Sequence, residues 1–203
     1  MGSSENEIKA MARDLGLGGI FLGTFDKHFP GFINKHAQCC AIVNTGDRQS
    51  GGVHWLAFGW EPKGQTFFMF DPFGFSDSKL KQMYDFEYEG LMKRSAIFST
   101  SDRCIQLKRN DTAVQGPRSA ACGLFCLMFL YAFLHWPRDP FDNNPVFGPL
   151  TGIAPSALFS PKSQAALFRN QEFLYTFLRA RSVYFRDHEM QIKQNTAFDK
   201  LKQ

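Results

Sequence analysis

The hydrophobic pattern of the chain is strongest in one continuous apolar run, which extends from Ala120 through Trp136 and stops at Pro137. A run of this length without an internal proline predicts a buried helix. A polar loop broken by Gly and Pro leads into the run and ends at Ser119, whose hydroxyl is suited to cap the first turn. The pattern therefore places Cys122 in the first turn of a central helix.

A cysteine at the start of a helix can serve as a nucleophile. The unpaired amides and the helix dipole at this end stabilise negative charge, which favours the reactive thiolate. The same amides can bind an oxyanion formed next to the sulfur. The side-chain amide of Gln115, in the preceding loop, is a candidate second donor. The alternative is a thiol that only packs inside an apolar helix, as we expect for Cys126.

Shorter patterns predict three further helices. Ser4 and Glu7 form a capping-box signature ahead of a helix that Gly16 closes. A second helix is expected over residues 76–94, with a serine as its cap. A third, amphipathic helix is expected over residues 163–181, with Phe168 among its inward positions, and the tail after it is polar and weakly patterned.

Several short segments are apolar or aromatic and are typical of strands. Two of them flank a four-residue turn that carries Pro62 and Gly64, which predicts a hairpin. The region between residues 18 and 31 is punctuated by Gly and Pro and is expected to be a loop. The predicted strands are residues 39–44, 51–60, 65–72, 96–98 and 104–107.

The predicted hairpin brings a histidine and a carboxylate together. If the turn is centred between Pro62 and Lys63, then Leu56 faces Met69, and His54 faces Asp71 on the same side of the sheet. A carboxylate bonded to an imidazole fixes its tautomer and supports its charged form, as in a catalytic triad. The alternative is a His–Asp pair that merely closes the end of a strand.

Composition narrows the class of protein further. The length and the 44% apolar content fit one domain over residues 1–203. The odd number of cysteines, five, argues against a disulfide framework, and their spacing argues against a metal site. The acidic, polar N-terminus does not resemble a signal peptide, and no apolar stretch is suited to span a membrane, so we expect a reducing compartment. A net charge of +4 permits contact with polyanions without requiring it.

Taken together, these motifs resemble the adenovirus endopeptidase family of viral maturation cysteine proteases, which is similar to the ubiquitin-like-protein proteases. The resemblance extends over nearly the full length. It is carried by Gly51-Gly52-Val53-His54-Trp55, Asp71-Pro72-Phe73-Gly74, Asp102-Arg103-Cys104-Ile105, Gln115-Gly116-Pro117 and Ser119-Ala120-Ala121-Cys122-Gly123-Leu124-Phe125-Cys126, with the opening Met1-Gly2-Ser3-Ser4-Glu5 and Phe29-Pro30-Gly31-Phe32.

The resemblance implies an α+β fold, with a mixed, largely antiparallel sheet packed between helices and the nucleophile at the N-terminus of a central helix. Carried over by position, Cys122 is the nucleophile, His54 the general base and Asp71 the carboxylate that orients it. Gln115 completes the oxyanion hole. The family often has Glu at the position of Asp71, so the shorter acid must reach the imidazole differently.

The resemblance also implies two cofactors and no metal. One is a short viral peptide from the C-terminus of a capsid precursor, which adds a strand to the sheet and forms a disulfide with Cys104. The other is viral DNA, bound without sequence specificity through Lys and Arg. The candidate DNA contacts are Lys93, Arg94, Arg103, Lys108, Arg109 and Arg118.

The implied substrates are viral capsid and core precursor proteins, cut at Gly-containing sites of the hydrophobic-X-Gly-X-Gly or hydrophobic-X-Gly-Gly-X type during virion maturation. The enzyme would be monomeric, would have no membrane partner, and would work in the virion and the host nucleus. Two alternatives remain at this stage. One is a deubiquitinase-like isopeptidase, and the other is a basic DNA-binding virion protein whose Cys122 is structural.

Overall fold

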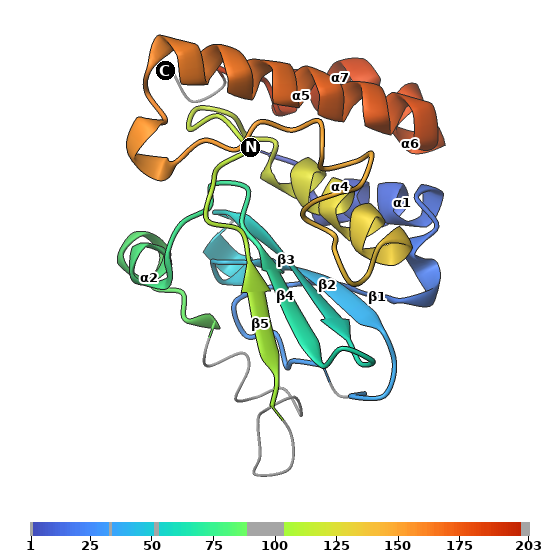
Figure 1. The fold of residues 1–203 in the computed structure, drawn as a ribbon. Coiled ribbons are helices and arrows are strands. Elements are labelled where there is room, and N and C mark those ends of the chain that lie inside the picture. The colour runs from blue at the N-terminus through green and yellow to red at the C-terminus, as the bar shows by residue number, and fades with distance from the viewer. Residues whose placement is uncertain (1, 33, 51–52, 89–103, 200–203) are drawn as a thin grey trace.

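The computed structural model describes residues 2–32, 34–50, 53–88 and 104–199. The strand predicted at 96–98, the end of the helix predicted over 76–94 and the glycine pair at 51–52 lie outside these residues. A five-stranded sheet carries helices on one face, and the C-terminal helices form a further layer beyond them (Figure 1). The helices are α1 (Glu5–Asp14), α2 (Asp77–Tyr84), α4 (Cys122–His135), α5 (Pro161–Arg181), α6 (Val183–Asp187) and α7 (Glu189–Asn195), with 3-10 turns η1 (Leu17–Gly19), η2 (Arg48–Ser50) and η3 (Pro155–Ala157).

The sheet is mixed, as predicted. Its strands lie in the order β1 (Phe21–Phe25), β2 (Cys39–Asn44), β3 (Trp55–Glu61), β4 (Thr66–Phe70) and β5 (Gln106–Arg109). The two inner pairings are antiparallel and the two outer ones are parallel. This order leaves β1 and β5 at the edges of the described sheet.

The core divides into two clusters because successive strand residues point to opposite faces. On one face, side chains such as Ile42 and Phe70 pack against α1 and α4, and α4 is buried nearly all round. On the other face, Val43 and Phe58 pack with Leu80 of α2 and with residues of the loop after β1. The strands β2, β3 and β4 are therefore buried on both sides.

The predicted hairpin is present, but its predicted register is wrong. Leu56 was expected to face Met69, whereas Met69 pairs with Phe58 and Phe70 pairs with Ala57. The turn is centred one residue later than predicted, because Glu61 still pairs with Thr66. The resulting offset is two residues, which preserves the face of every side chain.

Other elements depart from the sequence pattern in identifiable ways. The glycine-punctuated region after residue 18 contains β1, which pairs in parallel with β2. The α2 helix ends at Tyr84, because Asp85 adopts a left-handed conformation. Phe168 is exposed rather than inward, and the tail beyond α5 contains α6 and α7. None of the described helices combines the length and apolar character that crossing a membrane requires.

The first helix and the C-terminal helices are joined through one side chain. The carboxylate of Asp14, the last residue of α1, accepts hydrogen bonds from the Ser182 hydroxyl and the Tyr184 amide, each at 2.7 Å. Ser182 also caps α6, so this contact ties the start of α6 to the end of α1. The C-terminal layer is therefore anchored to the first helix as well as to α4.

Candidate active site

Cys122 is the first residue of α4, as the apolar run predicted. The helix begins later than expected: Ser119 is not its N-cap, and Ala121 occupies that position without a side-chain bond. The Ser119 hydroxyl instead accepts from the Ala121 amide at 3.2 Å. Within the described residues, no hydrogen-bond acceptor is present for the amides of Cys122 and Gly123. These donors are available beside the thiol.

Gly123 is required by the close packing of this helix end. A Cβ at this position would lie 3.0 Å from Ile8 Cδ1 of α1 and 3.2 Å from the Trp55 ring. The glycine therefore lets α1 and the start of β3 approach the first turn of α4. Cys126, one turn further along, is fully buried and its thiol contacts the Trp55 carbonyl at 3.3 Å, and burial raises its pKa. Cys126 is a packed thiol, as expected.

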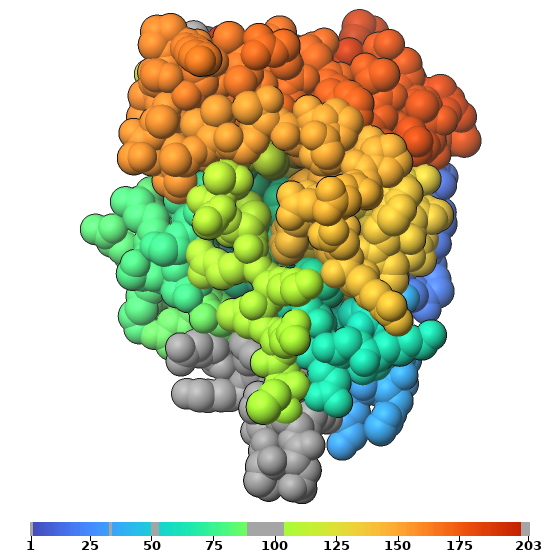
Figure 2. Space-filling view, viewed as in Figure 1, coloured from blue at the N-terminus to red at the C-terminus, as the bar shows by residue number. Residues whose placement is uncertain are grey.

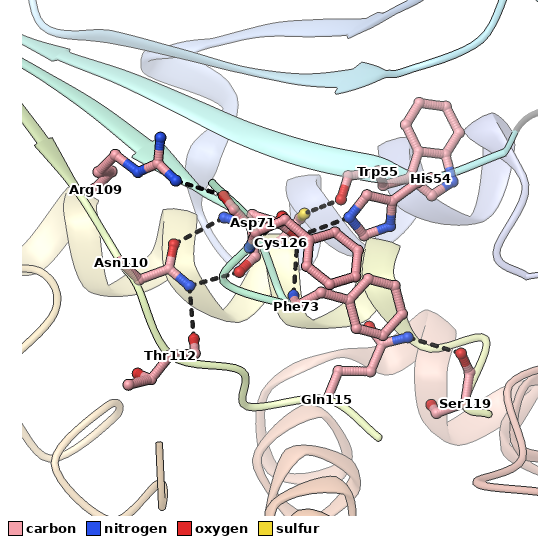
Figure 3. A network of polar contacts seen from close by, with 11 residues as sticks. His54, Trp55, Asp71, Phe73, Arg109, Asn110, Thr112, Gln115, Ser119 and Cys126 are labelled. Carbon is pink, nitrogen blue, oxygen red and sulfur yellow. Dashed lines mark hydrogen bonds and ion pairs between the residues drawn. The ribbon is translucent and has the colours of Figure 1, made fainter. Parts of the chain in front are cut away.

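His54 lies immediately before β3, and its side chain is only 1% exposed. Its Nε2 lies 2.7 Å from Asp71 Oδ1, so the predicted pair is present despite the shifted register. In the observed register the strand extension would oppose His54 to Phe73, and the two rings do stack, with centroids 4.8 Å apart. Tyr84 of α2 stacks on the same imidazole at 5.4 Å. Figure 3 shows His54, Asp71 and Phe73 together.

The surroundings of His54 favour its charged form. Burial alone would lower its pKa, but the charge and hydrogen bond of Asp71, with smaller contributions from the hydrogen bond and charge of Cys122, raise the pKa of His54 to about 10. The imidazole is therefore an imidazolium at neutral pH. His54 and Cys122 line the same cleft.

Asp71 is fixed by the backbone that follows it. Its Oδ1 also accepts from the Phe73 amide at 2.8 Å, and its Oδ2 accepts from the Phe75 amide at 3.0 Å. Asn110, directly after β5, accepts from the Asp71 amide at 2.9 Å and donates to the Asp71 carbonyl at 2.5 Å (Figure 3). Sequence reasoning missed Asn110, whose only signal was its place after a predicted strand.

Gln115 is fully buried in the loop before α4. Its Nε2 donates to the Ser119 carbonyl at 2.7 Å, as Figure 3 shows, and its Oε1 has no partner in the described structure. An amide nitrogen carries two hydrogens, so one N–H remains for a ligand. Because a carbonyl can only accept, the Ser119 carbonyl also fixes which end of the Gln115 amide faces it.

One cleft of about 1180 Å³ brings these residues together. Cys122, His54 and Gln115 all line it, and the N-terminal segment, α2 and the loop after η3 form its walls. Cys104 is exposed before β5 and does not line the cleft. Among the described residues, no group of His, Cys, Asp or Glu side chains is arranged to hold a metal ion.

This arrangement suits nucleophilic chemistry on a carbonyl group. A thiol at a helix N-terminus, next to a charged imidazole that a carboxylate orients, has the environment that generates a thiolate. The free amides of Cys122 and Gly123 and the remaining N–H of Gln115 can bind the oxygen of a tetrahedral intermediate. The opening to the sulfur is small, because the Cys122 residue is only 8% exposed.

Comparisons with known proteins agree with this chemistry. A family model described as adenovirus endoprotease matches residues 21–200. The protease of bovine adenovirus B serotype 3 is 59% identical over 201 residues, which are 99% of this chain and 98% of that protein. The protease of human adenovirus B serotype 3 is 60% identical over 200 residues, covering 98% and 95% of the two chains.

Among solved structures, the Chlamydia abortus effector protein ChlaDUB aligns with 16% identity and a TM-score of 0.41, over 72% of this chain and 58% of that one. A likeness this weak carries no argument about function. The family match and the high identities over nearly the whole chain are decisive. The chain therefore belongs to the adenovirus endoprotease family, and it is a viral cysteine peptidase.

Proposed function

We propose that this peptidase cleaves viral capsid and core precursor proteins at Gly-containing sites during virion maturation, with Cys122 as nucleophile and His54 as general base. Asp71 orients the imidazole, and Gln115 contributes to the oxyanion hole. The observation that carries the proposal is the buried His54–Asp71 pair at 2.7 Å. Its imidazole lines the same cleft as Cys122, which is at the free N-terminus of α4.

The reaction follows from these positions. The Cys122 thiolate attacks the scissile carbonyl carbon, and the negative oxygen is held by the backbone amides and Gln115. The C–N bond then breaks while the His54 imidazolium gives its proton to the leaving amine. Water, deprotonated by His54, attacks the thioester and releases the acid and the free thiol.

Two features of the cleft support the proposed site preference. The catalytic side chains are almost buried, so a residue with no side chain can approach the sulfur more closely than any other. Three large apolar residues, Val53, Met83 and Phe159, are exposed and all line this cleft, and Phe159 is 72% exposed. They offer an apolar surface for the hydrophobic residue upstream of the cleavage site.

The sheet supports activation by a short viral peptide. In the described structure β5 pairs only with β4, so its other edge offers free backbone groups to an added strand. The exposed thiol of Cys104 lies just ahead of that edge, where a cysteine of the peptide can form a disulfide with it. The peptide would be the C-terminal segment of a capsid precursor.

The net charge of +4 supports viral DNA as the second cofactor, bound through phosphates rather than bases. Of the six candidate cations, Lys93, Arg94 and Arg103 lie outside the described residues. Arg109 is bound to Asp77 and to the Phe75 carbonyl. The Lys108 ammonium donates to the Arg138 carbonyl at 3.5 Å, which leaves Arg118 as the better candidate among the described ones. An enzyme that acts where the viral DNA is packaged would be located in the virion and the host nucleus.

The test uses the full chain with fluorogenic peptides of the hydrophobic-X-Gly-X-Gly type, with and without the precursor peptide and double-stranded DNA. We expect cleavage after the second X, stimulation by both cofactors, and loss of the DNA effect at high salt. Cys122→Ala and His54→Ala should abolish cleavage. Replacing the first Gly of the substrate by Val is the matched control.

The proposal is wrong if the Val substrate is cut as well as the Gly substrate, or if Cys122→Ala retains activity. A ubiquitin conjugate in the same assay separates the nearest alternative, because a deubiquitinase-like isopeptidase would cleave it in preference to the peptides. A DNA-binding virion protein with a structural cysteine would retain DNA affinity but cleave neither substrate.

A further inference from the structure

A chain of buried polar groups connects the loop before α4 to the C-terminal layer of the molecule. The Ser119 hydroxyl donates to Gln171 Oε1 of α5 at 2.6 Å. Gln171 Nε2 in turn donates to the Thr196 carbonyl and to the Tyr175 hydroxyl, each at 2.7 Å. All these side chains are at least nine-tenths buried. These bonds join the loop to the C-terminal layer, which forms the orange upper part of the surface in Figure 2.

The donor and acceptor of each hydrogen bond between Thr196 and Ser119 are determined by the Thr196 carbonyl. The Thr196 carbonyl can only accept, so the amide nitrogen of Gln171 must face it and the amide oxygen must face Ser119. The Ser119 hydroxyl must then donate its hydrogen to Gln171, which leaves its lone pairs for the Ala121 amide. The first amides of α4 without a partner are therefore those of Cys122 and Gly123.

The backbone carbonyl of the same serine holds Gln115. The Ser119 carbonyl thus orients one proposed oxyanion donor directly, because Gln115 Nε2 donates to it. The Ser119 hydroxyl acts on the others indirectly, because it holds the amide of Ala121, the residue before Cys122. Ser119 has only one buried side-chain partner outside its own loop among the described residues, and that partner is Gln171. The position of the oxyanion donors thus depends on a residue of α5.

Two neighbouring contacts attach the rest of the loop to the same C-terminal layer. Asn170, next to Gln171, donates to the Val114 carbonyl at 3.0 Å. The Phe198 ring packs so closely on Gly116 that a Cβ there would lie 2.4 Å from it. The loop from Val114 to Ser119 is therefore fastened to the C-terminal layer at its start, its middle and its end.

We propose that Gln171 is a positioning residue for the oxyanion hole, acting through Ser119 on Gln115 and on the first amides of α4. The inference rests on the proposed catalytic roles of these groups and adds a part of the molecule that lies outside the cleft. Gln171 does not touch the substrate. It determines where the negative oxygen of the tetrahedral intermediate is bound, while the His54–Asp71 pair, which it does not contact, sets the reactivity of the thiol.

Two reactions of Cys122 separate these effects. Acylation by p-nitrophenyl acetate passes through a tetrahedral oxyanion, whereas alkylation by iodoacetamide displaces iodide and forms no such oxyanion. In the full-length Gln171→Leu variant we expect acylation per folded molecule to slow by about 10- to 100-fold. The alkylation rate of Cys122, located by mass spectrometry, should change less than about two-fold, because a displacement does not use these donors.

Three further variants make the test specific. Ser119→Ala should reproduce the selective loss of acylation, and Ser119→Thr, which keeps the hydroxyl, should largely restore it. If Gln171→Leu does not fold, the two Ser119 variants provide the test in its place. Tyr175→Phe is the matched control, because it removes a buried hydroxyl bonded to Gln171 Nε2 but leaves the bond from Gln171 to Thr196 and the path to Ser119. It should leave acylation unchanged.

The inference is overturned if acylation and alkylation fall together, if Tyr175→Phe slows acylation as much as Gln171→Leu, or if acylation is unaffected in Gln171→Leu. Failure of the proposed function has a different signature. In that case the wild-type thiol is acylated by the ester, with the dependence on Gln171 intact, but no Gly-containing peptide is cut.

Discussion

At the scale of single residues, the charged form of His54 is stabilised mainly by one neighbour, Asp71. Burial of an imidazole penalises its charged form, and Asp71 reverses that penalty through a 2.7 Å contact. Asp71 can do this because two backbone amides and Asn110 hold it in place, so the carboxylate does not need to reorganise when charge develops beside it. The side chain of an aspartate is therefore long enough to reach the imidazole at this position.

Replacing Asp71 by Asn should move the alkaline limit of activity. The His54 proton is needed for the leaving amine and is lost near pH 10 in the wild type, so activity should decline through that pH. Without the carboxylate, burial dominates and the limit should shift to lower pH, with kcat at neutral pH reduced roughly 100-fold. The measurement is a profile of kcat/KM from pH 6 to 11, and a superimposable profile for Asp71→Asn would contradict the assignment. Asp71→Glu is the control and should retain the wild-type shape.

The exposed apolar residues that line the cleft, Val53, Met83 and Phe159, lead to a second prediction at this scale. Phe159→Ser should raise KM about 10-fold for substrates with a hydrophobic residue upstream of the Gly, with little change in kcat, because it removes binding that is equal in the ground and transition states. Substrates with a polar residue there should be unaffected. Met190→Ser is the matched control, since Met190 is also exposed but does not line the cleft. Equal effects of the two variants would exclude a subsite at Phe159.

At the scale of elements, the sequence pattern predicts what is local and misses what is long-range. The capping box at Ser4 and Glu7 and the apolar run of α4 are local signals, and both are confirmed. The hairpin register was wrong by two residues because turn residues do not fix where pairing begins, yet this offset keeps His54 and Asp71 on one face. The role inferred for Gln171 has no local signal, because it depends on two distant partners, Ser119 and Thr196.

The packing of α4 against α1 can be tested through its glycine. Gly123→Val should lower the free energy of unfolding by about 1–3 kcal/mol, because its side chain would press on Ile8 and Trp55. Urea denaturation measures this. Ile8→Ala should itself destabilise the protein, but the double variant should lose less stability than the sum of the two single losses, because the smaller side chain makes room for the valine. A Gly123→Val protein as stable as the wild type, or a strictly additive double variant, would show that the contact is not tight.

At the scale of the whole molecule, the active site is built from layers whose residues lie far apart in the sequence. His54 and Asp71 come from the hairpin, Cys122 from α4, and the support of the intervening loop from α5 and the segment after α7. Since Asp14 of α1 also binds the start of α6, the C-terminal layer is tied to both the first helix and the catalytic loop. No single segment of the sequence contains this tertiary context, which is why the residues of α6 and α7 were predicted to form a polar, weakly patterned tail.

The buried ion pair should also make global stability depend on pH. The pKa of His54 is raised in the folded protein to about 10, above its ordinary value of 6.5, so folding favours the protonated form. This contribution is fully present below pH 6.5 and is lost as the pH rises through 10. Between these values the free energy of unfolding should fall by an amount on the order of a few kcal/mol. Urea denaturation of Cys122→Ser measures it without titration of the catalytic thiol, and adding His54→Gln should remove this part of the slope. If both proteins lose stability equally across this range, His54 is not protonated by the fold, and the thiolate–imidazolium account of the reaction loses its electrostatic basis.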